Sequence, residues 1–370
     1  MNRRKFLRGS LGGIAFPMVN FASHQVFAGA SRTYSTRVVD LVRRSLVIDM
    51  LAPLTLTLTP ERFAATLTPG EVTMFRQSGI DAFHHSVGVG GYDEVLAFMA
   101  GWNGFVGRNS DLFALVNQVG DIDRAKAHGK VAVIMGQQDA DHFRTPDDVK
   151  AFYQIGQRVS QLTYNAQNLL GSGSTERVDG GITDYGVAII KAMNEVGMLI
   201  DVSHSGDRTT LDAIALSPRP IAITHSNCRA LDNHPRLKTD EAIRALAAKG
   251  GVMGISGVRM FVKATEPTTV EDMVDHIDHV ARLVGVEHVS VGSDADLLGY
   301  DKMPAALNKQ LRAGYKSSYA FRAKIDTDGY DSPQKIFNLT EVLVARGYGD
   351  ADISLILGGN FRRLLAETWR

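Results

Sequence analysis

The sequence predicts an α/β fold of the TIM (β/α)8 barrel type. Eight short runs rich in Val and Ile alternate with helical patterns over about 250 residues. His204 ends one of these runs and His225 ends the next, with a short helical pattern between them. Parallel strands joined in this way place their carboxyl ends on one rim, where active sites are built. A doubly wound sheet is the alternative, but no glycine-rich phosphate loop follows the first strand.

The expected elements follow from the spacing of the apolar residues. The predicted strands cover residues 46–49, 80–87, 130–136, 158–163, 198–204, 220–226, 250–255 and 288–294. The predicted helices include residues 36–44, 146–155, 185–197, 205–217, 239–249 and 270–284. Residues 307–327, rich in Lys, Arg and Tyr, break this periodicity and are expected to form an insertion on the rim.

The amino terminus has the pattern of a twin-arginine export signal. Arg3 and Arg4 precede a run of small and apolar residues that ends in Ala-Gly-Ala at Ala30. The run is short and interrupted by a proline and polar residues, so we expect no stable membrane anchor. We therefore assign residues 1–30 to a signal peptide cleaved after Ala30, and residues 31–370 to a single domain. This predicts the twin-arginine export machinery as a partner and a periplasmic or secreted location.

The composition of the mature chain excludes some classes of partner. Removing the four basic residues of the signal leaves 36 basic against 40 acidic residues. A net charge near −4 argues against nucleic acid or an anionic membrane as a partner. Cys228 is the one cysteine in the sequence, so no disulfide forms within the chain despite an oxidising destination. A homodimer is left open.

Several short motifs between residues 130 and 363 occur in a characteristic order. They are LTYNAQN at 162–168, GGIT at 180–183, GMLIDVSH at 197–204, THSNCRAL at 224–231, HPR at 234–236, VGSDAD at 291–296 and GGNF at 358–361. In order and spacing they resemble the membrane (renal) dipeptidase family of zinc peptidases. The resemblance implies a metal-dependent TIM barrel, usually with two zinc ions, that hydrolyses dipeptides.

The metal ligands of that family are only partly present here. The family uses a His-x-Asp on the first strand, a bridging Glu after the third, and histidines on the fifth and sixth. This chain keeps the last two as His204 and His225. Leu51 and Pro53 stand at the His-x-Asp positions, and Gln138 stands at the bridging position. A neutral amide does not neutralise the repulsion between two cations, so the pattern argues against a binuclear site.

We therefore expect one zinc ion per chain. His204, His225, Asp294 at the end of the eighth strand, and a water would fill one tetrahedral shell. Asp294 is alternatively the acid/base of the reaction or a residue that caps the next turn. Asp296 is the reserve for the same position.

Other polar residues near the predicted rim are either metal ligands or residues with a structural role. His84 or His85 would supply a compensating ligand, although a half-buried structural pair is the favoured interpretation. Asp139, Asp141 and His142 follow the third strand, close to the lost bridging position. For Asp139 the favoured role is to cap the helix that follows.

The resemblance implies a substrate-binding role for two residues. Tyr164 replaces the substrate-facing histidine of the family and would donate a hydrogen bond to the developing oxyanion. Arg236 matches an arginine that binds the carboxylate of the substrate, which a guanidinium does with two parallel bonds. Arg229 is the runner-up for this role.

The leading functional hypothesis is a metal-dependent hydrolase of dipeptides or similar small amides. Zinc would lower the pKa of its bound water, and Asp294 would carry the proton to the leaving amine. Two alternatives remain: a single-metal barrel enzyme that acts on a non-peptide metabolite, and a non-catalytic relative that only binds. The retention of His204, His225, Asp294 and Arg236 favours chemistry over binding alone.

Overall fold

A parallel barrel forms the centre of the molecule. The computed structural model describes residues 23–26, 32–52, 61, 64–87 and 90–369. In this part of the chain the barrel strands, in spatial order, are β3 (Ile48–Asp49), β4 (Ala82–Val87), β6 (Val131–Gln137), β7 (Gln157–Gln161), β8 (Leu199–Asp201), β9 (Ala222–Ser226), β10 (Val252–Ile255) and β11 (Val289–Val291). The circle closes where the Met50 N–H donates to Val291 O at 2.8 Å and the Asp294 N–H donates to Leu51 O at 2.9 Å. The predicted TIM barrel is confirmed.

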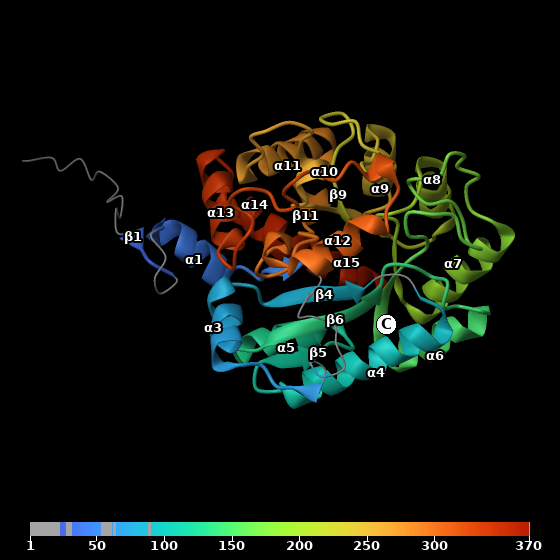
Figure 1. Ribbon diagram of the computed structural model, residues 1–370, viewed down its shortest axis with the longest axis horizontal. Helices are drawn as coiled ribbons and strands as arrows, with labels where there is room; N and C mark the ends of the chain where they lie inside the picture. Colours follow the sequence, from blue (N-terminus) through green and yellow to red (C-terminus); the bar gives the residue numbers. More distant parts are fainter. Residues whose placement is uncertain (1–22, 27–31, 53–60, 62–63, 88–89, 370) are drawn as a thin grey trace, which may run out of the picture.

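Helices surround the strands on the outside (Figure 1). They include α1 (Thr36–Arg44), α3 (Pro69–Ser78), α4 (Tyr92–Arg108), α5 (Val119–Ala127), α6 (Pro146–Gln154), α7 (Asp184–Val196), α8 (Asp207–Leu216), α9 (Asp240–Ala248), α10 (Arg259–Val262), α11 (Val270–Val284), α13 (Lys335–Ala345), α14 (Asp350–Ser354) and α15 (Asn360–Thr368). Threonines begin several of them: the side chains of Thr183 and Thr239 accept from the backbone N–H three residues on. Gly197 ends α7 with a φ of 84°, a conformation that favours glycine. The predicted helices are all found, with ends that differ by two residues or fewer.

The two ends of the barrel interior differ in polarity. At the amino end, side chains such as Ile134 and Leu199 pack against Phe361 and Leu364 of α15, which closes that end with an apolar plug. At the carboxyl end the inward positions are polar. On β4, for example, His84 lies against Gly136 inside the barrel, since a Cβ at Gly136 would be 1.9 Å from His84 Nε2.

Some features of the fold were not predicted. The short strand β5 (Phe113–Leu115) pairs with the first half of β6, and β1 (Ser23–His24) pairs antiparallel with β2 (Tyr34–Ser35). Most of the assigned signal, including Ala30, lies outside the described residues, as does Pro53, so cleavage after Ala30 stays a prediction. Within the described ranges, none of the helices combines the length and the apolar character needed to span a bilayer.

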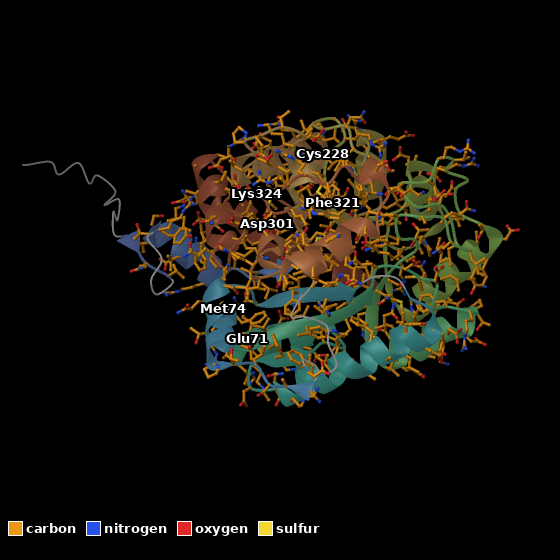
Figure 2. The ribbon with its side chains drawn as sticks, in the orientation of Figure 1. Glu71, Met74, Cys228, Asp301, Phe321 and Lys324 are labelled. Carbon is orange, nitrogen blue, oxygen red and sulfur yellow. The ribbon has the colours of Figure 1, made fainter. Side chains whose placement is uncertain are left out.

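The predicted insertion lies on the carboxyl rim, between β11 and α13. It begins earlier than the predicted residue 307, since the segment contains η2 (Tyr300–Lys302), α12 (Ala305–Ala313) and η3 (Ser317–Tyr319). In Figure 1, α12 lies over the middle of the barrel, and Figure 2 labels Asp301, Phe321 and Lys324 of the same segment. Its apolar side chains pack on the loops that follow β9 and β10, through residues such as Leu237 and Phe261. The insertion therefore covers the end of the barrel where the histidines lie.

Candidate active site at the carboxyl end of the barrel

His204 and His225 meet as predicted. His204 follows β8 and His225 lies in β9, and both side chains are buried. Their Nε2 atoms are 2.9 Å apart. Two nitrogens bound to one tetrahedral zinc lie about 3.3 Å apart, so a separation wider by a few tenths of an ångström would admit the ion.

The other ring nitrogens fix how the two imidazoles face each other. His204 Nδ1 lies 2.8 Å from Asn165 Oδ1, an amide oxygen that only accepts, so this nitrogen donates. Thr224 Oγ1 donates its one proton to Asp201 Oδ2 at 2.5 Å, so it accepts from His225 Nδ1 at 2.8 Å. Both Nε2 atoms are then left with lone pairs that converge on one point. This is the arrangement of metal-binding imidazoles whose second nitrogens are held by the protein.

Burial and neighbouring cations keep this pair uncharged. Loss of hydration lowers the pKa of both histidines well below the ordinary value, and the charge of Arg236 lowers it further. Neutral imidazole is the form that binds metal. At neutral pH the two rings are therefore ready to act as ligands.

Two buried basic side chains hold the main chain on either side of the histidines, and burial and the charge of Arg236 lower the pKa of one of them, Lys238, to about 7. Arg236 donates through Nη1 to Ser203 O, and through Nη2 to His225 O at 3.1 Å. Lys238 Nζ donates to Val202 O and Ser205 O, both at 2.7 Å, and to Thr210 Oγ1. Sequence reasoning missed Lys238, because a single lysine beside the HPR motif carries no signal of burial.

Arg236 has little capacity left for a substrate. Both terminal nitrogens are engaged by the backbone, and Nε has no hydrogen-bond partner among the described residues. That Arg236 binds a substrate carboxylate stays a prediction, and Nε is the nitrogen left to make that bond. Arg229, the runner-up, makes a two-bond ion pair with Asp207 at the start of α8.

Asp294 does not complete a three-ligand set. Among the described residues, no group of three histidine, cysteine or acidic side chains is placed to hold a metal ion. Asp294 adopts a left-handed φ of 49°, and its N–H is tied to Leu51 O. Burial raises the pKa of its carboxyl to about 7, and the charges of Asp49 and Asp201 add to this while Arg236 opposes it. The expected shell of His204, His225 and Asp294 is thus reduced to the two histidines. Asp296, the reserve, accepts from the N–H of the next residue instead.

Tyr164 covers one face of His204. The two rings stack with centroids 4.1 Å apart and planes 19° apart. The phenol of Tyr164 forms a 2.7 Å hydrogen bond with that of Tyr315 in the insertion. Burial and the nearby Tyr315 raise the pKa of Tyr164 well above its usual value, so it stays a donor. Tyr315 was not singled out from the sequence, because the insertion has no periodic pattern.

Comparison with known proteins identifies the relatives of this barrel. The sequence pattern of the membrane dipeptidase family, peptidase family M19, matches residues 37–313. The chain belongs to this family.

Two curated fungal relatives match about the same length. The dipeptidase verJ of Clonostachys rogersoniana is 28% identical over 261 residues, covering 70% of this chain and 61% of the relative. The dipeptidase tcpJ of Claviceps purpurea is 27% identical, covering 70% of this chain and 56% of the relative. The match therefore spans less than two thirds of either relative.

Solved structures match over a larger share. An amidohydrolase from Pseudomonas aeruginosa superposes with a TM-score of 0.80 at 29% identity, covering 90% of this chain and 99% of that one. A metallopeptidase from Rhodobacter sphaeroides, solved with a phosphinate mimic of L-Ala-D-Ala, has a TM-score of 0.71 at 18% identity and covers 87% of this chain. The second likeness concerns the fold alone.

The residues at the ligand positions that differ from the M19 pattern, Leu51 and Gln138, make other contacts. Leu51 is fully buried, and its carbonyl accepts from Asp294. Gln138 Nε2 donates to Ser86 O at 3.2 Å. His84 lies inside the barrel with Nδ1 2.8 Å from Met50 O, and burial lowers its pKa to about 4. On the side of the barrel formed by β3, β4 and β6, the described residues at the two ligand positions, Leu51 and Gln138, therefore supply no carboxylate for a second metal ion.

The remaining rim candidates have structural roles in the M19 fold of this chain. His85 points outward and packs on Trp102, with ring centroids 3.8 Å apart. His142 Nε2 lies 3.1 Å from Gln157 Oε1. The prediction that Asp139 caps a helix is wrong, because Thr145 and Asp148 form the capping box of α6. Asp139 instead accepts from Asn168, and burial and Asp141 raise its pKa to about 6.

Proposed function

We propose that this protein hydrolyses dipeptides or similar small amides with one zinc ion bound by His204 and His225. The observation that carries the proposal is the pair of neutral imidazoles whose lone pairs converge at 2.9 Å. Membership of peptidase family M19 supports the same reaction class. The donor set fits one ion and does not fit two, since Leu51 and Gln138 supply no carboxylate.

Each group around the pair has a defined part in such a reaction. Bound zinc would supply a water with a pKa near neutrality. Asp294, whose pKa is raised to about 7, is suited to accept that proton and return it to the leaving amine. Tyr164 stays protonated beside His204 and can donate to an oxyanion. The Nε–H of Arg236 is left to bind a carboxylate.

The test combines metal analysis with hydrolysis. The purified wild-type protein is expected to hold about one zinc per chain and to cleave dipeptides. His204→Ala and His225→Ala should lose both the zinc and the activity. His279→Gln is the matched control, because this histidine pairs with Asp240 on outer helices and should keep both properties. A zinc-loaded wild-type protein that cleaves no dipeptide would contradict the proposal.

Export is a separate part of the proposal. The pattern around Arg3 and Arg4 supports transport through the twin-arginine machinery to the periplasm or beyond. Replacing both arginines by lysine should leave the precursor unprocessed in the cytoplasm. Normal processing of that variant, measured by fractionation and mass, would argue against this route.

A non-catalytic binding protein is the second candidate. The lack of a third ligand among the described residues favours it. In that case dipeptide analogues would bind, and prolonged incubation with zinc would give no product.

A further inference from the structure

The insertion brings a cluster of aromatic rings to the mouth of the barrel. Tyr315 and Tyr319 lie with ring centroids 4.4 Å apart, and Phe321 is 5.3 Å from Tyr315. Tyr319 also contacts Phe261, at 5.4 Å, and the ring of His234, at 5.8 Å. These rings come from the insertion and from the loops after β9 and β10. Together they form an aromatic wall beside the two histidines.

This aromatic wall contacts the site through two phenols. The Tyr315 hydroxyl bonds to that of Tyr164, which in turn stacks on His204. The Tyr319 hydroxyl lies within hydrogen-bonding reach of the Arg236 guanidinium. Tyr315 and Tyr319 therefore lie directly behind two residues of the candidate site, Tyr164 and Arg236.

The insertion is held at its base by a set of hydrogen bonds from backbone N–H groups, and its tip also makes an exposed ion pair. At the base, Asp301 accepts from the N–H groups of residues 325 and 326, and Asp326 accepts from those of residues 300 and 301. At the tip, Lys316 Nζ contacts Glu176 Oε1 at 3.0 Å and Thr175 O at 3.1 Å. The Lys316 side chain is 54% exposed, so this ion pair adds little stability. The tip is therefore joined to the β7–α7 loop by this exposed ion pair and by the Tyr164–Tyr315 hydrogen bond.

We propose that Tyr315 and Tyr319 determine substrate specificity, by selecting amides with an aromatic side chain next to the scissile bond. This inference rests on the proposed amide hydrolysis. An aromatic substrate side chain would replace the Tyr164–Tyr315 contact and pack against the ring faces of the wall. A favourable aromatic pair is worth up to about tenfold in affinity, whereas a methyl group gains no such contact. Small dipeptides such as Ala-Ala would leave the phenols paired with each other.

Binding is measured separately from turnover. The probes are reduced-amide analogues of Ala-Ala, Phe-Ala and Ala-Phe, titrated by calorimetry into the zinc-loaded protein. At least one of the two Phe analogues is expected to bind more tightly than the Ala-Ala analogue, by up to about tenfold. The Phe analogue that binds more tightly identifies which side of the scissile bond faces the aromatic wall. Equal affinities for all three would overturn the inference.

Variants connect the preference to the named residues. Tyr315→Leu and Tyr319→Leu should reduce the ratio to about twofold or less, while Tyr315→Phe keeps the ratio because the ring remains. Lys316→Ala should speed association of the Phe analogue, because it removes the ion pair with Glu176 in the β7–α7 loop. Lys324→Ala is the matched control, since it removes an exposed ion pair with Asp328 instead. Thermal melting verifies that each variant folds. If folded Tyr315→Leu and Tyr319→Leu keep the wild-type ratio of Phe to Ala-Ala affinity, these two tyrosines do not determine the preference.

The two proposals fail in different ways. Hydrolysis without aromatic preference would leave the proposed function intact and remove the specificity role. Aromatic preference in binding, with no turnover of the matching dipeptides, would retain the specificity role and remove the hydrolase.

Discussion

The two sides of the barrel mouth differ in what surrounds the metal-ligand positions. On the side of β8 and β9, His204 and His225 are both held at Nδ1, and Arg236 holds the main chain beside them. On the side of β3, β4 and β6, Leu51 and Gln138 stand at ligand positions, and His84 is bonded to a carbonyl through one nitrogen only. One half of a metal site has kept its supporting contacts, while the other half has lost both ligands and support. Supporting contacts and ligands therefore occur together on the side of β8 and β9, which makes the histidine pair the part of this rim best suited to hold a metal ion.

The largest expected effect concerns the supporting cation Lys238. Lys238→Met should lower the free energy of unfolding by about 3–5 kcal/mol, because three buried acceptors lose their donor. Replacing a buried charge by an apolar group is often neutral, but only when its partners are removed as well. Chemical denaturation measures the change, with exposed Lys324→Met as the control. A loss below about 1 kcal/mol would mean that water replaces the ammonium.

The opposite side should make the protein sensitive to acid. Burial lowers the pKa of His84 to about 4 and of His85 to about 3, while the unfolded values are near 6.5. The unfolded state therefore binds more protons, so stability is full above about pH 6.5 and is lost as the pH falls toward 4. His84 contributes about 3 kcal/mol to this loss as the pH falls toward 4, and His85 contributes about 5 kcal/mol as the pH falls on toward 3. His85→Phe should reduce the slope of unfolding free energy against pH. A slope equal to that of the wild type would show that His85 titrates normally.

Metal affinity should depend on Asp201, which accepts from Thr224 and Ser203. Asp201→Asn places a donor against Thr224 and disturbs the orientation of His225, so zinc affinity should fall about 10- to 100-fold. Competition with a chelating dye measures the affinity. Asp278→Asn, whose carboxylate bonds Arg346 and Tyr348 on the outside, is the control. An unchanged affinity in Asp201→Asn would show that Thr224 alone orients the ring.

The smallest expected effect is that of restoring one lost ligand. Gln138→Glu should leave the zinc content at about one per chain, because a bridge binds no second ion when position 51 still carries leucine. Metal analysis of the variant gives the answer directly. Two zinc ions per chain would reveal ligands on the β3 side that the present contacts do not indicate.

The sequence predicted the barrel and the histidine pair well, for a physical reason. Most barrel strands lie in short runs rich in apolar residues that are followed by polar ones, and that pattern is local. The third ligand was not predictable in the same way, because the placement of Asp294 depends on its bond to Leu51 about 240 residues away in the chain. Tyr315 and Lys238 act through neighbours distant in sequence, and β5 is too short to give a periodic signal.

The closure of the barrel at Leu51 has an evolutionary consequence. The backbone of this residue joins the first strand to the last, whatever side chain it carries, because only its carbonyl takes part. At this position the side chain, which sets the chemistry, can thus change independently of the backbone, which closes the barrel. A lineage can lose a metal ligand here, or regain one, without opening the barrel. Residue 51 is therefore a position where enzyme design can exchange a side chain while keeping the backbone bond that closes the barrel.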